Sequence, residues 1–192
     1  ICIGSDESSN NTMLDEYKQE CTPFGLTMYR ECDIKAQFSD QCREIQLAYC
    51  DYTADDSSLS VRFKDTHYPL EVILNYRIFP HSDIIQRWTT VRNTGDTEIR
   101  FERLFSAQFS LPSTKPYTFR NTNGAWGGEF VETATRLEGG YAMWDSRKGA
   151  TNHGHSPHFI AAQNADENTG DVYFASLAYS GNFKVSASRD SF

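Results

Sequence analysis

LEVILNYRIFPHSDIIQRWTTVRNTGD, residues 70–96, is the stretch that decides the fold class of this 192-residue chain. Apolar and polar residues alternate along 70–79 and again along 84–93. A period of two is typical of a β-strand with one buried face. Residues 80–83, PHSD, separate the two runs and have the composition of a turn. The stretch therefore predicts two strands joined by a turn.

The same alternation recurs along the rest of the chain, in 32–38, 43–50, 58–65, 98–111, 130–145, 159–163 and 171–188. Residues 39–41 are expected to join the first two of these runs into a hairpin. Residues 93–96, NTGD, are expected to close another, because Asn and Gly tolerate the positive φ of tight turns. No window shows a helical period over a dozen residues. We therefore predict an all-β, antiparallel β-sandwich without internal repeats or linkers.

Length and composition favour one core. With 39% hydrophobic residues the chain can bury a sizeable interior, so we expect a single sandwich domain over 14–192. Residues 1–13 are small and polar and predict a flexible N-terminal arm.

No window approaches the ~18 consecutive apolar residues of a membrane helix. The net charge of −8 comes without a Lys/Arg-rich patch, which argues against nucleic-acid and anionic-membrane partners.

The cysteines argue against a zinc or redox motif, because no CxxC occurs. Cys42 and Cys50 lie at the two ends of one predicted run, about 26 Å apart at ~3.3 Å per residue, so they cannot form a disulfide with each other. The odd count of five leaves at least one thiol free or bonded to another chain. The sequon at Asn10 agrees with a secreted protein. All five cysteines fall in the first fifty residues: Cys2, Cys21, Cys32, Cys42 and Cys50.

Acidic residues do not form a recognisable catalytic pair. Most glycoside hydrolases need two carboxyl groups that flank the scissile bond. Asp55 and Asp56 lie in a Ser/Thr/Asp segment that predicts a solvated turn, while Glu129 and Asp145 each follow a tryptophan without an identifiable partner. No serine lies in a nucleophile-elbow context. We therefore assign no catalytic residue and no cofactor to this chain.

Three histidines, His153, His155 and His158, cluster in a glycine-containing segment. They could hold a transition metal if the segment wraps around it. Loop histidines that only hydrogen-bond to the backbone are commoner, so these three are weak metal candidates and we expect no metal site.

The segment GAWGGE, residues 124–129, places Trp126 among three glycines. Glycines let the backbone approach a ligand closely, and an indole offers a flat apolar face that suits the C–H face of a sugar ring. A tryptophan that caps the sandwich core is the alternative, and the residues alone do not exclude it.

Six motifs together resemble the N-terminal β-supersandwich (galactose mutarotase-like) domain of glycoside hydrolase family 36 α-galactosidases. The first of them, CTPFGLTMYRECDIKAQF, is similar to fungal members in particular. The order and spacing of five separate motifs match the family across 20–192. The six motifs lie at 21–38, 70–96, 103–112, 123–129, 146–159 and 173–183.

The resemblance implies that catalysis belongs to a downstream (β/α)₈ barrel whose Lys-Trp-Asp nucleophile segment this chain lacks. It also implies that the N-terminal domain builds oligomers and lends loops to a galactose-binding site, commonly that of a neighbouring subunit. In this sequence one such loop contains Tyr29 and Arg30, and we count Gly124, Trp126 and Glu129 as sugar-binding candidates in the other. The family often has an aspartate where this chain has Met28, so a carboxylate contact to galactose is expected to be missing.

The family's domain continues beyond the segment matched here, so we expect a sandwich truncated before its last strands. The run 183–188 would then present an unpaired edge, which predicts a homo-oligomer formed through an exposed edge or face. The first functional hypothesis is a non-catalytic, lectin-like protein that binds a galactose-containing saccharide. The alternative is an accessory or oligomerisation domain, or a fragment, of a full α-galactosidase. A hydrolase that works on this chain alone is the third, disfavoured reading.

Overall fold

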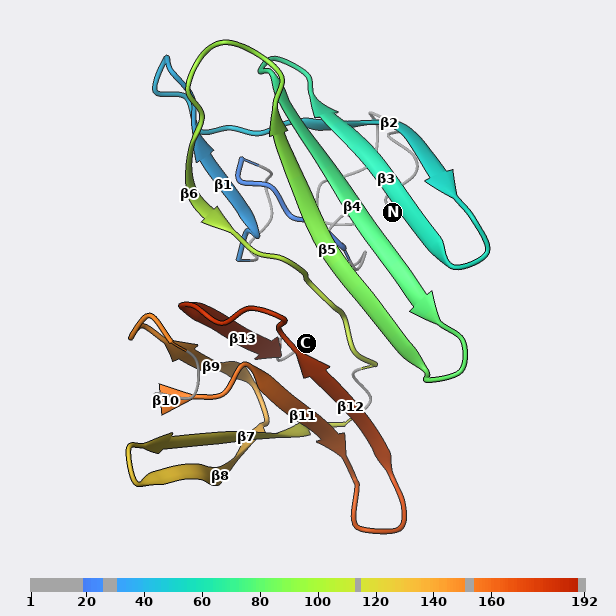
Figure 1. Cartoon of the computed structure of the whole chain (residues 1–192), viewed down its shortest axis with the longest axis vertical. Coiled ribbons are helices and arrows are strands. Elements are labelled where there is room, and N and C mark those ends of the chain that lie inside the picture. The colour runs from blue at the N-terminus through green and yellow to red at the C-terminus, as the bar shows by residue number, and fades with distance from the viewer. Residues whose placement is uncertain (1–18, 26–30, 113–114, 151–153, 190–192) are drawn as a thin grey trace. The chain divides into compact units, whose positions relative to one another are not determined.

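The computed structural model describes residues 19–25, 31–112, 115–150 and 154–189, and these contain strands and no helix. They cluster into two compact units, Ile1–Leu111 and Pro112–Phe192 (Figure 1). Within the described ranges, no helix is long and apolar enough to cross a membrane. The predicted arm and Asn10 lie outside the described residues. The expectation of one sandwich domain over 14–192 stays a prediction.

A four-stranded antiparallel sheet dominates the first unit, in the order β2-β3-β4-β5. Its strands are β2 (Leu47–Ala54), β3 (Ser58–Asp65), β4 (Leu70–Phe79) and β5 (Ile84–Asn93). The register of β4 and β5 runs from Leu70↔Asn93 to Phe79↔Ile84. The hairpin predicted from residues 70–96 is therefore confirmed.

A second layer of the first unit consists of β1 (Ile34–Gln37) and β6 (Arg100–Leu104), which pair antiparallel. Side chains of β1 and β4 share one buried cluster, so the two layers enclose a hydrophobic core. Its members are Ile34, Ala36, Phe38, Ile45, Leu70, Val72 and Leu74.

Two predicted pairings of the first unit are wrong. The runs 32–38 and 43–50 do not form a hairpin, because β1 pairs with β6 instead. Residues 93–96 do form a turn, in which the Gly95 N–H donates to Asn93 Oδ1 at 3.1 Å, but β5 and β6 belong to different sheets. The physical reason is that the alternating apolar face of β1 must be covered by β4, so the chain leaves the four-stranded sheet at this turn.

Cysteines in the described ranges are free thiols. Cys42 lies in a segment without strand structure ahead of β2, and Cys50 lies within β2, so the two do not bracket a single strand as predicted. The free thiols are Cys21, Cys32, Cys42 and Cys50.

The second unit is built on β7 (Tyr117–Ala125), which pairs antiparallel with three other strands. Those three are β8 (Gly128–Leu137), β10 (Gly154–His155) and β11 (His158–Gln163), and β12 (Asp171–Ser176) continues the sheet beyond β11. A separate two-stranded sheet consists of β9 (Gly140–Ser146) and β13 (Phe183–Arg189).

Aromatic side chains join the two sheets of the second unit. Trp144 on β9 is buried, and its ring centroid lies 5.3 Å from that of Phe119 on β7 and 6.1 Å from that of Phe159 on β11. β13 pairs with β9 from Phe183 to Arg189, and no other described strand pairs with it. The all-β, antiparallel prediction is thus confirmed in both units.

Candidate functional site

Trp126 stands at the tip of the β7–β8 hairpin. Ala125 and Gly128 pair, so the connection consists of Trp126 and Gly127 alone. The Trp126 side chain is among the most exposed large apolar groups in the described chain, with 89% of its surface accessible. An indole exposed to this extent can offer its flat apolar face to a partner. The alternative of a tryptophan that caps the core does not describe Trp126, and Trp144 occupies such a place instead.

The hairpin backbone at this tip needs glycine. A Cβ on Gly124 would lie 2.6 Å from Glu129 Cα and closer still to the Gly128 carbonyl oxygen. Gly127 has a φ of 78°, in the left-handed region that glycine adopts without strain. The two glycines therefore allow β7 and β8 to approach tightly directly below the exposed ring.

Glu129 contacts the backbone of the same turn. Its Oε1 accepts a hydrogen bond from the Gly127 N–H at 3.0 Å. The sequence made Glu129 a candidate sugar ligand, and that role stays a prediction. The structure places its carboxylate beside the turn that presents Trp126.

The histidine segment lies next to this hairpin. In the β7–β10 ladder, Gly154 pairs with Gly124 and His155 with Asn123. Two segments that the sequence singled out separately, 124–129 and 148–158, thus meet at one end of the second unit.

The histidines themselves hydrogen-bond to protein groups. His155 Nδ1 lies 3.1 Å from the Asp145 carbonyl oxygen, and His158 Nε2 lies 3.3 Å from Thr122 Oγ1. His153 is outside the described residues. Among the side chains described, no three His, Cys, Asp or Glu residues are arranged to hold a metal ion.

The other predicted loop, with Met28, Tyr29 and Arg30, lies outside the described residues. The chain on either side of that segment is held together. Phe24 N–H donates to the Ile34 carbonyl at 2.9 Å, and Asp33 N–H donates to the Thr22 carbonyl at 3.0 Å. These contacts join the two segments from which residues 26–30 depart.

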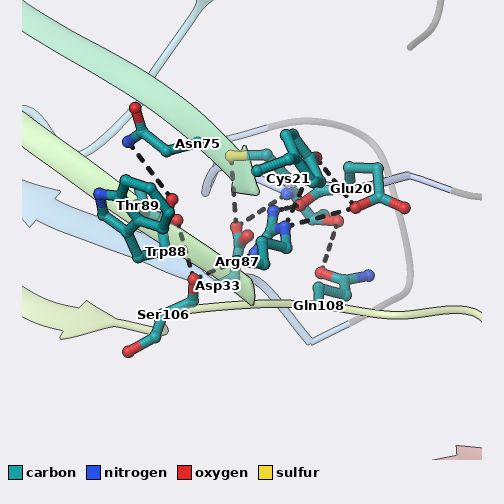
Figure 2. A network of polar contacts seen from close by, with 11 residues as sticks. Glu20, Cys21, Asp33, Asn75, Arg87, Trp88, Thr89, Ser106 and Gln108 are labelled. Carbon is teal, nitrogen blue, oxygen red and sulfur yellow. Dashed lines mark hydrogen bonds and ion pairs between the residues drawn. The ribbon is translucent and has the colours of Figure 1, made fainter. Parts of the chain in front are cut away.

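A network around Arg87 anchors the same region, and nothing in the sequence pattern predicted it (Figure 2). The Arg87 side chain, on β5, is only 1% exposed. Its guanidinium donates to the backbone carbonyls of Glu20 and Ser106, the latter at 3.0 Å, and lies 3.4 Å from the Glu20 carboxylate. Tyr76 accepts a further hydrogen bond from Arg87 Nε at 3.4 Å. One buried cation therefore joins three separate segments of the first unit.

Asp33 and Cys21 extend this network. Asp33 Oδ1 accepts the Thr22 N–H at 2.7 Å and lies 3.8 Å from Cys21 Sγ. Burial raises the pKa of Asp33, although the Thr22 N–H opposes that shift. Burial also raises the pKa of the Cys21 thiol, and the Asp33 carboxylate adds to this effect. Cys21 is consequently a poor nucleophile, and the network is a structural anchor.

Two of the candidate carboxylates, Asp55 and Asp145, contact groups of their own segments. Asp55 accepts the backbone N–H groups of Ser57 and Ser58, both at 2.8 Å, and hydrogen bonds, the strongest from Ser58, lower its pKa to about 2. The predicted solvated turn is confirmed. Asp145 forms an ion pair with Arg147 at 2.6 Å.

The chain was compared with known protein families. The model of the glycosyl hydrolase family 36 N-terminal domain matches residues 3–192. The chain belongs to this family.

Named relatives of this family 36 N-terminal domain are α-galactosidases. The α-galactosidase AgaA of Geobacillus stearothermophilus is 28% identical over 97% of this chain, and α-galactosidase 2 of Pediococcus pentosaceus is 33% identical over 71% of it. The chain spans 28% and 19% of the lengths of these two relatives. A fungal relative, the probable α-galactosidase C of Aspergillus terreus, is 32% identical over 71% of the chain.

Solved structures agree with the fold. The crystal structure of the α-galactosidase AgaB from Geobacillus stearothermophilus superposes with a TM-score of 0.85 at 26% identity, over 93% of this chain and 27% of AgaB. A variant of AgaA, solved in complex with raffinose, superposes with a TM-score of 0.83 at 26% identity, over 91% of this chain and 27% of AgaA. The supersandwich fold predicted from the resemblance is therefore confirmed, while a specifically fungal character is not supported.

Proposed function

We propose that this family 36 N-terminal domain recognises galactose-containing saccharides without cleaving them, and that Trp126 supplies the binding face. The exposed indole at the β7–β8 tip is the observation on which the proposal rests. A planar apolar ring can pack on the C–H groups of a galactose ring, whose hydroxyls then remain available to polar groups. The sugar-binding role of Tyr29 and Arg30 stays a separate prediction.

Catalysis is not part of the proposal for this chain. The candidate acids Asp55 and Asp145 contact their own turn or a neighbouring arginine, and Glu129 contacts the Trp126 turn. A retaining glycosidase needs two carboxyl groups about 5 Å apart on either side of the bond. The relatives named as α-galactosidases are several times longer than this chain, so we propose that the acids for cleavage come from polypeptide outside it.

Replacement of Trp126 tests the proposal. We expect Trp126→Ala to weaken the binding of galactose, melibiose and raffinose about tenfold or more, because the stacking face is lost. The melting temperature should hardly change, since the ring contributes little buried area. Isothermal titration calorimetry at millimolar sugar measures the first effect, and thermal unfolding measures the second.

Tyr141→Ala is the matched control, because Tyr141 is 67% exposed in the same unit but on another strand. Its sugar affinity should equal that of the wild-type chain. The proposal is wrong if the wild-type chain releases no heat with any of the three sugars, or if both variants bind them equally well.

The second candidate function is subunit assembly. Large apolar side chains are exposed in each unit, including Ile85 on β5 and Phe174 on β12, both 66% accessible. Such side chains commonly mark surfaces that another chain covers. We therefore propose a homo-oligomer, and expect light scattering at micromolar concentration to give a multiple of the chain mass. A monomer at all concentrations would contradict this second proposal and leave the first untouched.

A further inference from the structure

The turn that presents Trp126 is not one of the two that short hairpins favour. Two-residue hairpins favour type I′, with positive φ at both loop residues, or type II′, with positive φ at the first. Here φ is positive at the second loop residue, Gly127, and not at Trp126. The local twist of this turn therefore does not match that of the strands, and the turn needs support from elsewhere.

A bulge in β8 follows the turn and increases the local twist of the strand. The ladder register shifts by one residue between the pairs Asn123↔Val131 and Ala125↔Gly128. Phe130 adopts a φ of 60°, which is unusual for a residue other than glycine. Phe130 directly follows Glu129 in β8. The Glu129 side chain extends from this part of the strand back to the turn.

The Glu129 carboxylate supports the turn directly. A hydrogen bond that closes such a two-residue turn would use the N–H of the residue after the loop, which leaves the exposed Gly127 N–H available to another acceptor. Glu129 Oε1 accepts it at 3.0 Å, and an ionised acceptor makes this bond stronger than one between neutral groups.

We propose that Glu129 is a positioning residue that fixes the Trp126–Gly127 turn and thereby orients the exposed indole toward its ligand. The galactoside part of this inference rests on the proposed function of Trp126. Glu129 acts on the sugar through Trp126, which differs from the direct sugar contact that the sequence predicted.

The test uses three variants of the 192-residue chain and two NMR measurements. Hydrogen exchange of the Gly127 amide reports the turn, and galactose titration followed on the Trp126 indole resonance reports the ligand. Glu129→Ala should accelerate Gly127 exchange at least fivefold and weaken galactose binding about three- to tenfold. Glu129→Gln keeps an acceptor oxygen at the same place but loses the charge, so both changes should be clearly smaller than those of Glu129→Ala. Glu132→Gln, which removes another acid of β8, should change neither.

Each outcome decides the proposal. Unchanged Gly127 exchange in Glu129→Ala overturns it. So does a Glu129→Gln variant that loses galactose binding while its Gly127 exchange stays normal, since Glu129 would then contact the sugar itself.

If the wild-type chain does not bind galactose, the proposed function fails, but the exchange measurements still decide the role of Glu129. If Glu129→Ala does not fold, acid titration of the wild type replaces it: the Gly127 amide resonance must move together with the Glu129 carboxylate resonance, and independent movement overturns the proposal.

Discussion

Arg87→Met lowers the free energy of unfolding of the first unit by about 2–4 kcal/mol. Methionine retains apolar contacts but leaves the carbonyls of Glu20 and Ser106 without their donor inside the structure. Removal of one partner from a buried ion pair typically costs about 3–5 kcal/mol, and the partly exposed Glu20 carboxylate reduces that figure here. Native-state hydrogen exchange of the β4 and β5 amides measures the loss.

The control for this prediction comes from the same hairpin. Arg77 lies on β4 with its guanidinium carbon 5.2 Å from the Phe79 ring centroid, and it is exposed. Arg77→Met should change the stability by no more than about 0.5 kcal/mol. An Arg87→Met chain as stable as Arg77→Met would mean that the network in Figure 2 does not anchor the first unit.

Gly124→Ala has the largest expected effect in the second unit, a loss of about 2–3 kcal/mol. The new Cβ would lie 2.6 Å from Glu129 Cα, and backbone atoms cannot move aside as a flexible side chain can. The β7–β8 ladder must therefore open near the Trp126 turn. Hydrogen exchange of the amides of β7 and β8 reports both the size and the place of the loss.

Gly128→Ala adds the same methyl group four residues later, where the nearest atom is the Ala125 carbonyl oxygen at 3.9 Å. We expect its stability to stay within about 0.5 kcal/mol of wild type. If Gly124→Ala proves as mild as Gly128→Ala, the two strands are not as tightly apposed at the tip as described here.

Strands were predictable where apolar and polar residues alternate along the sequence. The runs 58–65, 70–79 and 84–93 match β3, β4 and β5 residue for residue, because the alternation of apolar and polar side chains follows the pleat. The run 98–111 was overextended, since only Arg100–Leu104 forms a strand, β6. Residues beyond it, such as Ser106, contribute carbonyl groups to the Arg87 network instead of a ladder.

Strand pairing was less predictable, because it depends on contacts between distant residues. The pairing of β1 with β6 joins Ile34 to Leu104, and no local pattern distinguishes it from a hairpin with the next strand. The turn at 93–96 was recognised by its composition, but composition does not say whether the following strand joins the same layer or the other one.

The candidate site was predicted only in outline. The three glycines around Trp126 indicated a tight approach of backbone, which Gly124 shows. The Glu129–Gly127 hydrogen bond depends on the bulge and on an uncommon turn, which a pattern of residue types does not reveal. From the sequence alone, Arg87 is an ordinary charged residue of a strand. It is buried because segments distant in the sequence fold over it.

The Trp126 indole resonance during a galactose titration tests the central claim most directly. The chain has three tryptophans, of which Trp144 is buried and Trp88 lies on β5 of the first unit, so the three indole signals can be told apart by single replacements. We predict a saturable shift of the Trp126 signal with galactose, and none with a sugar-free osmolyte. A titration in which that signal stays in place while the sugar reaches tens of millimolar, or in which only Trp88 responds, would contradict the account.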